Sequence, residues 1–325
     1  MDPGFPDDDP MWVSAAAPAT VANVVCGFDV FGFAVHQPSD RVRVRWLSAG
    51  PGPQVSIGRI TGDDGRLPIG SDRNTAGVAI LRLMHHLGLS GSVEMELHKG
   101  LPLGSGLGSS AASSVAALVA FDALAGLGLS RRELLPFAID AERMACGAAH
   151  ADNVAPGLLG GFVLIRGYEP LDVVSIPYPE TLHAVLVHPA IELETRDSRQ
   201  VLKGVVPLKD AVAQWGNTAG LVAGLMMGDL RLIARSMTDH VVEPTRGLLI
   251  PGYTRVKDAA LDAGALGAGI SGSGPTLFAL CDVTADERLP SRIGSAMQEA
   301  FSQVGLQSTV FHSPLSAEGA RLIPS

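Results

Sequence analysis

Polar and apolar residues alternate along two stretches in the first half of the chain. Val93–His98 reads Val-Glu-Met-Glu-Leu-His, and Arg41–Leu47 is built in the same way. A period of two is the pattern of a strand with one buried face. Thr75–Leu87 and the alanine-rich segment Ala111–Ala125 are predicted to be helices.

The rest of the chain carries further helix and strand signals. Ser130-Arg131-Arg132-Glu133 is a capping box and predicts a helix that ends near Cys146. The glycine- and proline-punctuated patch Gly147–Gly161 predicts a loop. The other predicted elements are strands Phe162–Arg166 and Leu182–His188, helices Ala211–Met227, Asp229–Met237 and Tyr253–Ala263, strand Leu277–Cys281, helix Pro290–Val304 and strand Gln307–His312.

These elements do not alternate regularly, which favours an α+β fold over a doubly wound sheet. A chain of 325 residues is long enough for two domains. Proline-rich loops near residue 178 place the boundary there, giving domains at residues 11–178 and 179–325. Residues 1–10 are predicted to be a disordered acidic tail.

The composition narrows the possible partners. Lys and Arg number 24 against 33 Asp and Glu, for a net charge of −9, and no basic run occurs. Such a balance argues against nucleic acid or an anionic membrane as partner. The three cysteines are widely spaced without a Cys-x-x-Cys motif, which indicates neither a disulfide framework nor a zinc site and fits a reducing cytoplasm. No apolar run approaches the ~18 residues of a membrane span.

The segment Leu101–Ala112 carries the most specific chemistry. Gly104, Gly106 and Gly108 leave the backbone bare, so peptide N–H groups can surround an anion. The N-terminus of the predicted helix follows, with roughly +0.5 of an elementary charge and free N–H donors. The glycines form neither a Walker A motif nor a dinucleotide fingerprint. The segment therefore predicts a phosphate cradle, with a tight turn made for close helix packing as the alternative.

A phosphate cradle without a Walker lysine needs another source of positive charge. Mg²⁺ on a nucleotide takes one or two protein ligands, and a serine hydroxyl in the first helical turn is one such ligand. We predict Ser110 and Glu142 as the pair. Ala138 and Ala141 describe a closely packed helix side next to Glu142, which indicates that Glu142 points inward. A solvated helix face is the alternative.

Four other polar groups are candidates for substrate contacts. They are the glycine-bounded loop His150-Ala151-Asp152-Asn153, the turn Asn23–Asp29, and the arginines Arg199 and Arg246. A guanidinium fork suits a carboxylate or a phosphate. The alternatives are helix caps, a hairpin turn and surface arginines. A second glycine cluster, Gly264–Thr276, has the same two interpretations as the first.

Taken together, the motifs resemble those of the GHMP superfamily, which contains galactokinase, homoserine kinase, mevalonate kinase and phosphomevalonate kinase. The matching motifs are Pro18–Asp29, Pro102–Ala112 and Gly269–Thr276, in the expected order. Within the superfamily the chain is most similar to the homoserine kinase family. That similarity rests on Pro18-Ala19-Thr20, Asn23, Gly27-Phe28-Asp29, the pair Thr195 and Arg199, and the pair Pro244 and Arg246. The family's glycine-proline before the phenylalanine is here Val25-Cys26.

The resemblance implies an N-terminal ribosomal protein S5 domain 2-like domain, a C-terminal ferredoxin-like domain and an active site in the cleft between them. It implies ATP-dependent phosphorylation of the side-chain hydroxyl of L-homoserine, in threonine biosynthesis, with Mg²⁺ and in a homodimer. Asn74 and Lys99 are then candidates for contacts with the base and ribose. The implied phosphate-binding positions are Pro102, Gly104, Ser105, Gly106, Leu107, Gly108, Ser109 and Ser110.

The resemblance also assigns the amino-acid end. Arg199 and Arg246 would hold the homoserine carboxylate. Asn153 would lie at the reacting hydroxyl and orient it, since an amide is no base near neutral pH, and Asp152 as general base is the alternative. The implied substrate-binding positions are Asn23, Asp29, His150, Asp152, Thr195, Arg199, Arg246 and Gly272.

Two other functions remain open at this point. One is another GHMP small-molecule kinase, acting on mevalonate, shikimate or an isoprenoid precursor. The twin arginines argue for an amino acid instead, because a zwitterion needs a carboxylate grip. The other is a catalytically inactive regulator. The presence of Gly104, Gly106, Gly108 and Glu142 argues against it, because inactive relatives tend to lose the glycines or the metal-binding carboxylate.

Overall fold

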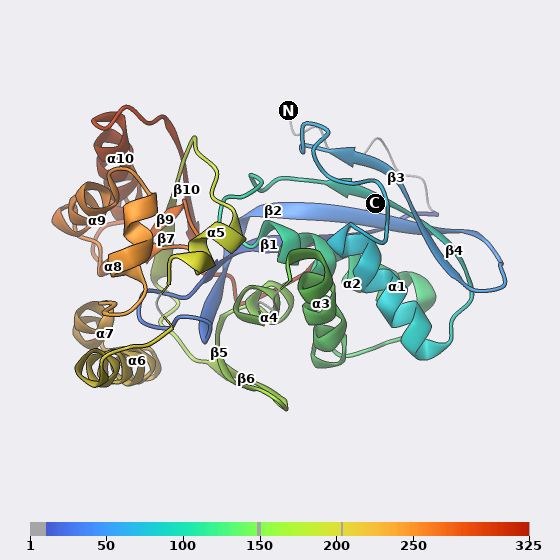
Figure 1. The fold of residues 1–325 in the computed structure, drawn as a ribbon, viewed down its shortest axis with the longest axis horizontal. Helices are drawn as coiled ribbons and strands as arrows, with labels where there is room; N and C mark the ends of the chain where they lie inside the picture. The colour runs from blue at the N-terminus through green and yellow to red at the C-terminus, as the bar shows by residue number, and fades with distance from the viewer. Residues whose placement is uncertain (1–10, 148–150, 203, 325) are drawn as a thin grey trace.

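A computed structural model of the chain describes residues 11–147, 151–202 and 204–324. The predicted acidic tail at residues 1–10 lies outside this range. The described chain forms two sheets with helices packed on them (Figure 1). Among the described residues, none of the helices has the length and apolarity needed to cross a membrane.

The larger sheet has seven strands in the order β11-β1-β2-β4-β3, with β5 and β6 extending from β2. All its pairs are antiparallel except β3 with β4. Four helices, α1 to α4, lie along one face (Figure 1). The elements are β1 (Val13–Ala22), β2 (Phe31–Ser48), β3 (Pro53–Thr61), α1 (Thr75–Leu87), β4 (Gly91–His98), α2 (Ser109–Ala125), α3 (Arg131–Cys146), α4 (Ala151–Leu159), β5 (Phe162–Tyr168), β6 (Leu171–Ile176) and β11 (Arg321–Ile323).

The smaller sheet has four antiparallel strands in the order β10-β7-β9-β8. Helices α9 and α10 pack on one face, and α6 pairs with α7 beside β8 (Figure 1). The elements are β7 (Leu182–Pro189), α5 (Thr195–Gln200), α6 (Leu208–Met227), α7 (Leu230–Ser236), α8 (Glu243–Arg246), the 3₁₀ turn η1 (Gly247–Leu249), α9 (Tyr253–Asp262), β8 (Gly267–Ile270), β9 (Leu277–Asp282), α10 (Leu289–Ser302) and β10 (Ser308–Pro314).

Both faces of the smaller sheet are buried. On β7, Leu182 and Leu186 join the core of the larger sheet, whereas Val185 joins the cluster under α9 and α10. Successive side chains of a strand point to opposite faces, so one strand supplies both cores. Phe278 of β9 meets Phe33 of β2 at a ring-centroid distance of 5.9 Å. One continuous apolar core therefore holds the two sheets together.

Most elements agree with the sequence prediction, including the capping box in which Ser130 and Glu133 bond reciprocally. The prediction of a loop over Gly147–Gly161 was wrong, because Ala151–Leu159 form helix α4. Seven of its nine residues are buried, against the larger sheet and α2. That burial stabilises the helix although it contains a proline and a glycine, two residues with low helix propensity.

Candidate active site

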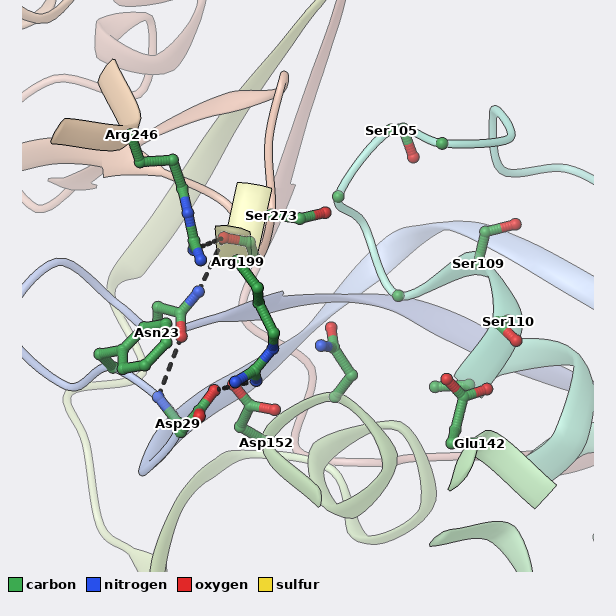
Figure 2. A pocket seen from close by; sticks show the side chains of 17 residues that line it. Asn23, Asp29, Ser105, Ser109, Ser110, Glu142, Asp152, Arg199, Arg246 and Ser273 are labelled. Carbon is green, nitrogen blue, oxygen red and sulfur yellow. Dashed lines mark hydrogen bonds and ion pairs between the residues drawn. The ribbon is translucent and has the colours of Figure 1, made fainter. Parts of the chain in front are cut away.

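Most of the predicted site residues line one pocket, to which both halves of the chain contribute. The glycine-rich segment before α2, residues 101–108, is called the phosphate loop. This loop and the N-terminus of α2 form one end of the pocket, and two arginines with two aspartates lie at the other end (Figure 2). Loops, α3 and α4 from the first half and segments near α5, α8 and β8 from the second half all contribute. The predicted residues that it brings together are Asn23, Asp29, Gly104, Ser105, Gly106, Gly108, Ser109, Ser110, Glu142, Asp152, Asn153, Arg199, Arg246 and Gly272.

The three glycines of the phosphate loop have backbones that other residues rarely adopt. Their φ angles are +63° at Gly104, +78° at Gly106 and +68° at Gly108. A Cβ on Gly106 would collide with the carbonyl of Ser271. A Cβ on Gly108 would collide with the Thr20 hydroxyl. The turn is thus closely packed, as the alternative interpretation proposed, and the Leu107 N–H donates to the Ser105 hydroxyl at 3.3 Å.

The N-terminus of α2 faces the pocket with donors left over. Gly108 is its N-cap and offers no side chain to accept from the first-turn N–H groups. Within the described chain, the buried Ser109 hydroxyl has no hydrogen-bond partner. Free N–H groups at the positive end of a 17-residue helix form a favourable site for an anion.

Lys99 and Asn74, predicted at the nucleotide base and ribose, line an adjoining hollow. The Lys99 ammonium pairs with Asp40 and donates to the Ser109 carbonyl at 2.8 Å. The Asn74 carboxamide caps α1, accepting from Ala76 N–H at 3.1 Å. Both polar groups therefore have partners inside the protein, and their contact with a nucleotide stays a prediction.

Sequence reasoning missed Asp40, which is fully buried. Its Oδ1 accepts from the N–H groups of Gly100 and Leu101 at 3.0 and 3.1 Å. It thus anchors the start of the phosphate loop. No local pattern marks this residue, because its partners lie about 60 positions further along the chain.

The loop after β1 shapes the amino-acid end of the pocket. Asn23, Val24, Val25 and Asp29 all have positive φ. Such backbone strain costs of order 1–3 kcal/mol per residue and is found preferentially at functional sites. The Asn23 amide donates to the Gly272 carbonyl at 2.7 Å and accepts from the Asp29 N–H at 3.0 Å. The strained turn is thereby tied to the second glycine cluster.

The two predicted arginines meet in this pocket. Arg199 bonds to Asp29 at 2.7 Å, and buried Arg246 donates to the Gly272 carbonyl at 3.0 Å. Both guanidinium carbons lie near the Phe28 ring, at 5.5 and 5.3 Å from its centroid. Figure 2 shows Arg199 directed at Asp29 and Asp152. The sequence suggested surface arginines as the alternative, which the burial of Arg246 excludes for that residue.

This geometry is accompanied by similarity to known kinases over nearly the whole chain. Residues 74–161 match the GHMP kinases N terminal domain, and residues 220–303 match the GHMP kinases C terminal family. A homoserine kinase of Chlorobium phaeobacteroides (strain BS1) is 48% identical over 96% of this chain and 99% of its own length. One of Xylella fastidiosa (strain 9a5c) is 43% identical over 95% and 93%.

A solved structure agrees with these relatives. The crystal structure of homoserine kinase from Cytophaga hutchinsonii ATCC 33406 covers 98% of this chain and 100% of its own, with 51% identity and a TM-score of 0.92. The chain belongs to the homoserine kinase family. The predicted two-domain α+β fold is confirmed by two sheets with helices and by matches to the N- and C-terminal GHMP kinase families, and the chain is a kinase.

Asp152 is an acid of the kinase pocket with a strongly shifted pKa. Burial, and next the negative charge of Asp29, raise its pKa to about 7, while the charges of Arg199 and Arg246 act against this rise. Its Oδ1 has no hydrogen-bond partner among the described residues. It lies on α4, not in the loop predicted from sequence, so its position is set by a packed helix.

Asn153 follows Asp152 on the same helix. Its Oδ1 accepts from the Thr20 hydroxyl at 2.9 Å. Because that bond occupies the carbonyl end, the amide NH₂ is the end available to a ligand. Asn153 can therefore donate to a substrate oxygen.

Glu142 of α3 is buried and lines the kinase pocket, as the alanines around it predicted. Figure 2 shows its carboxylate beside the Ser110 hydroxyl. No group of three or more His, Cys, Asp or Glu side chains that could hold a metal occurs in the described part of the chain. One carboxylate with one hydroxyl suits a Mg²⁺ ion that takes its other ligands from phosphate and water.

Four further predictions fall elsewhere. His150 lies outside the described residues. Thr195 begins α5, and its side chain is outside the described part. Leu107 is buried, and its carbonyl accepts from the Thr20 N–H at 3.0 Å, so its role here is to anchor the loop. Pro102 is not among the residues that line the pocket.

Proposed function

We propose that this chain transfers the γ-phosphoryl group of ATP to the side-chain hydroxyl of L-homoserine, giving O-phospho-L-homoserine for threonine biosynthesis. The observation that carries the proposal is the pairing of two unlike ends in one pocket. An anion cradle forms one end, and two arginines with two aspartates form the other. A zwitterionic amino acid that carries a reactive hydroxyl matches this arrangement.

The amino-acid end would hold homoserine by its charges. Arg246 and Arg199 would bind the carboxylate, because a guanidinium fork matches two carboxylate oxygens. Asn23, Asp29 and Asp152 would receive the ammonium and orient the substrate chain. The bond from Arg199 to Asp29 and that from Arg246 to Gly272 orient both forks before substrate arrives, which reduces the entropy lost on binding.

The cradle would hold the triphosphate. Backbone N–H groups from Gly104 to Ser110 would bind phosphate oxygens, aided by the α2 dipole. Ser110 and Glu142 would hold Mg²⁺, which when bound neutralises phosphate charge. Phosphoryl transfer through a loose transition state depends mainly on such positioning and neutralisation.

The hydroxyl proton needs an acceptor. Asp152 fits as general base, because a pKa of about 7 leaves much of it ionised at neutral pH. The Asn153 NH₂ would orient the hydroxyl oxygen or a phosphate oxygen. Direct transfer of the proton to the γ-phosphate, with Asn153 as the orienting group, is the alternative.

A substrate panel tests the function. ATP consumption is measured with homoserine, mevalonate and shikimate, each at millimolar concentration, and turnover is expected with homoserine alone. Arg246→Met is expected to lower kcat/KM for homoserine at least ~100-fold, because a buried charge-assisted bond is lost. Absence of turnover with homoserine would contradict the proposal. Nucleotide binding without turnover of any substrate would favour the inactive regulator instead.

Three predictions from the sequence complete the proposal. They are the requirement for Mg²⁺, assembly as a homodimer and a cytoplasmic location. EDTA treatment followed by Mg²⁺ addition, and sedimentation of the purified chain, test the first two.

A further inference from the structure

A buried acid outside the pocket connects the segments that form its amino-acid end. Glu243, at the start of α8, is 5% exposed. Its Oε1 accepts from the Ile270 N–H at 2.8 Å. Its Oε2 accepts from the Tyr253 hydroxyl at 2.6 Å and from the Lys257 ammonium at 2.7 Å. These bonds tie α8 to α9 and to the end of β8.

Helix α8 needs such a support. It has four residues, too few to be stable as an isolated helix, and it ends at Arg246. Asp239 caps its N-terminus by accepting from the Glu243 N–H at 2.7 Å. The Glu243 side chain then fixes where the helix lies against the sheet. The position of the Arg246 guanidinium follows from that placement.

The second segment held by Glu243 also reaches the pocket. Ile270 directly precedes the turn that carries Gly272. The Gly272 carbonyl accepts from both Arg246 and Asn23, at 3.0 and 2.7 Å. Gly269 leaves the space that the Glu243 carboxylate fills, since a Cβ there would collide with Oε1. One carboxylate thus sets the spacing between Arg246 and the carbonyl that orients it.

We propose that Glu243 is a positioning residue for homoserine binding. Its carboxylate holds Arg246 and the Gly272 turn in the relative positions that the substrate carboxylate requires. This inference rests on the proposed function. The bonds of the Glu243 carboxylate go to α9 and the end of β8. The turn after β8 also contacts the phosphate loop, because the Ser271 hydroxyl donates to the Gly106 carbonyl at 2.8 Å, but Asp40 and Thr20 hold that loop from the other side. Loss of the carboxylate is therefore expected to raise the KM for homoserine more than the KM for ATP.

The test compares Glu243→Gln with the unaltered enzyme in steady-state assays that vary homoserine and ATP separately. An amide keeps an acceptor for Ile270 but leaves the Lys257 ammonium without its ion pair. We expect the KM for homoserine to rise ~10-fold, since small misplacement of a binding group costs up to ~100-fold, while the KM for ATP stays within about twofold. Lys257→Met, whose site is partly exposed, should shift the homoserine KM in the same direction by less.

Asp286→Asn serves as the matched control, because it removes an exposed ion pair with Arg292 in the same half of the chain. It should leave every constant unchanged. If Glu243→Gln and Lys257→Met both lower the melting temperature but leave the KM for homoserine unchanged, the role of Glu243 is purely structural and the inference is overturned. Equal rises in both KM values would overturn it as well. If the unaltered enzyme does not phosphorylate homoserine, the proposed function fails first, and calorimetric titration with homoserine then decides on Glu243 separately.

Discussion

Asp152 shows how a single residue acquires its chemistry from its surroundings. Burial and the charge of Asp29 raise its pKa from 3.8 to about 7. Arg199 and Arg246 limit that rise, so the carboxyl titrates near neutral pH. An ordinary exposed aspartate would be fully ionised there and a weak base.

The pH dependence of the rate tests this residue. Asp152 is protonated below its pKa and ionised above it, so kcat/KM is expected to rise with pH through about 7 and then level off. Asp152→Asn should lower kcat ~100-fold or more and remove this limb. Near-full activity of that variant, together with a ~100-fold loss in Asn153→Leu, would assign the proton to the γ-phosphate instead.

At the scale of elements, the phosphate loop is clamped by its neighbours. Asp40 of β2 holds its start, Thr20 of β1 binds the Leu107 carbonyl, and the Thr276 N–H binds the Ser105 carbonyl at 3.2 Å. Rigid support of this kind preorganises the N–H groups for an anion, so little conformational entropy is lost when phosphate binds.

Gly108→Ala and Gly128→Ala form a matched pair that tests the clamp. Both glycines have left-handed backbones, with φ of +68° and +67°, but only at Gly108 would a Cβ collide with other groups, the Thr20 hydroxyl and the Asn153 carboxamide oxygen. Gly128→Ala should cost roughly 1–2 kcal/mol of stability and leave the KM for ATP unchanged. Gly108→Ala should raise the ATP KM ~10-fold or more. Equal effects of the two changes would show that backbone strain alone matters.

Across the whole molecule, the pocket depends on both sheets being held together. The apolar core is continuous from β2 to β9, and an exposed ion pair between Arg66 and Glu192 spans the loops beside Gly104. An exposed pair contributes little, so the shared core is the main connection. Ligands at either end of the pocket should therefore stabilise the whole chain.

Thermal melting with ligands tests this coupling. A nonhydrolysable ATP analogue and homoserine, each at about 100 times its dissociation constant, should each add about 2.7 kcal/mol to the free energy of unfolding. The chain should melt in one transition that moves upward with either ligand. Two transitions, of which homoserine moves only one, would contradict a shared core.

The sequence by itself determined the features that depend on near neighbours. The glycines at 104, 106 and 108 indicated a bare backbone turn, and the structure gives all three a positive φ, which glycine adopts without strain. The capping box at Ser130 and the limits of α1 followed from contacts within four residues. The predicted inward position of Glu142 also came from a local pattern, the alanines on its side of α3.

Only the tertiary structure decided the rest. It turned the glycine-bounded segment around Asp152 into a buried helix and paired Lys99 with Asp40. It also joined Glu243 to Ile270, and it brought Arg246 and Asn23 to the same Gly272 carbonyl. These partners lie up to about 250 positions apart, and no local preference encodes their meeting. Burial and charge pairing set the pKa of Asp152 and the orientation of the two arginines. Both depend on which surfaces the folded chain brings together, so only the tertiary structure could decide them.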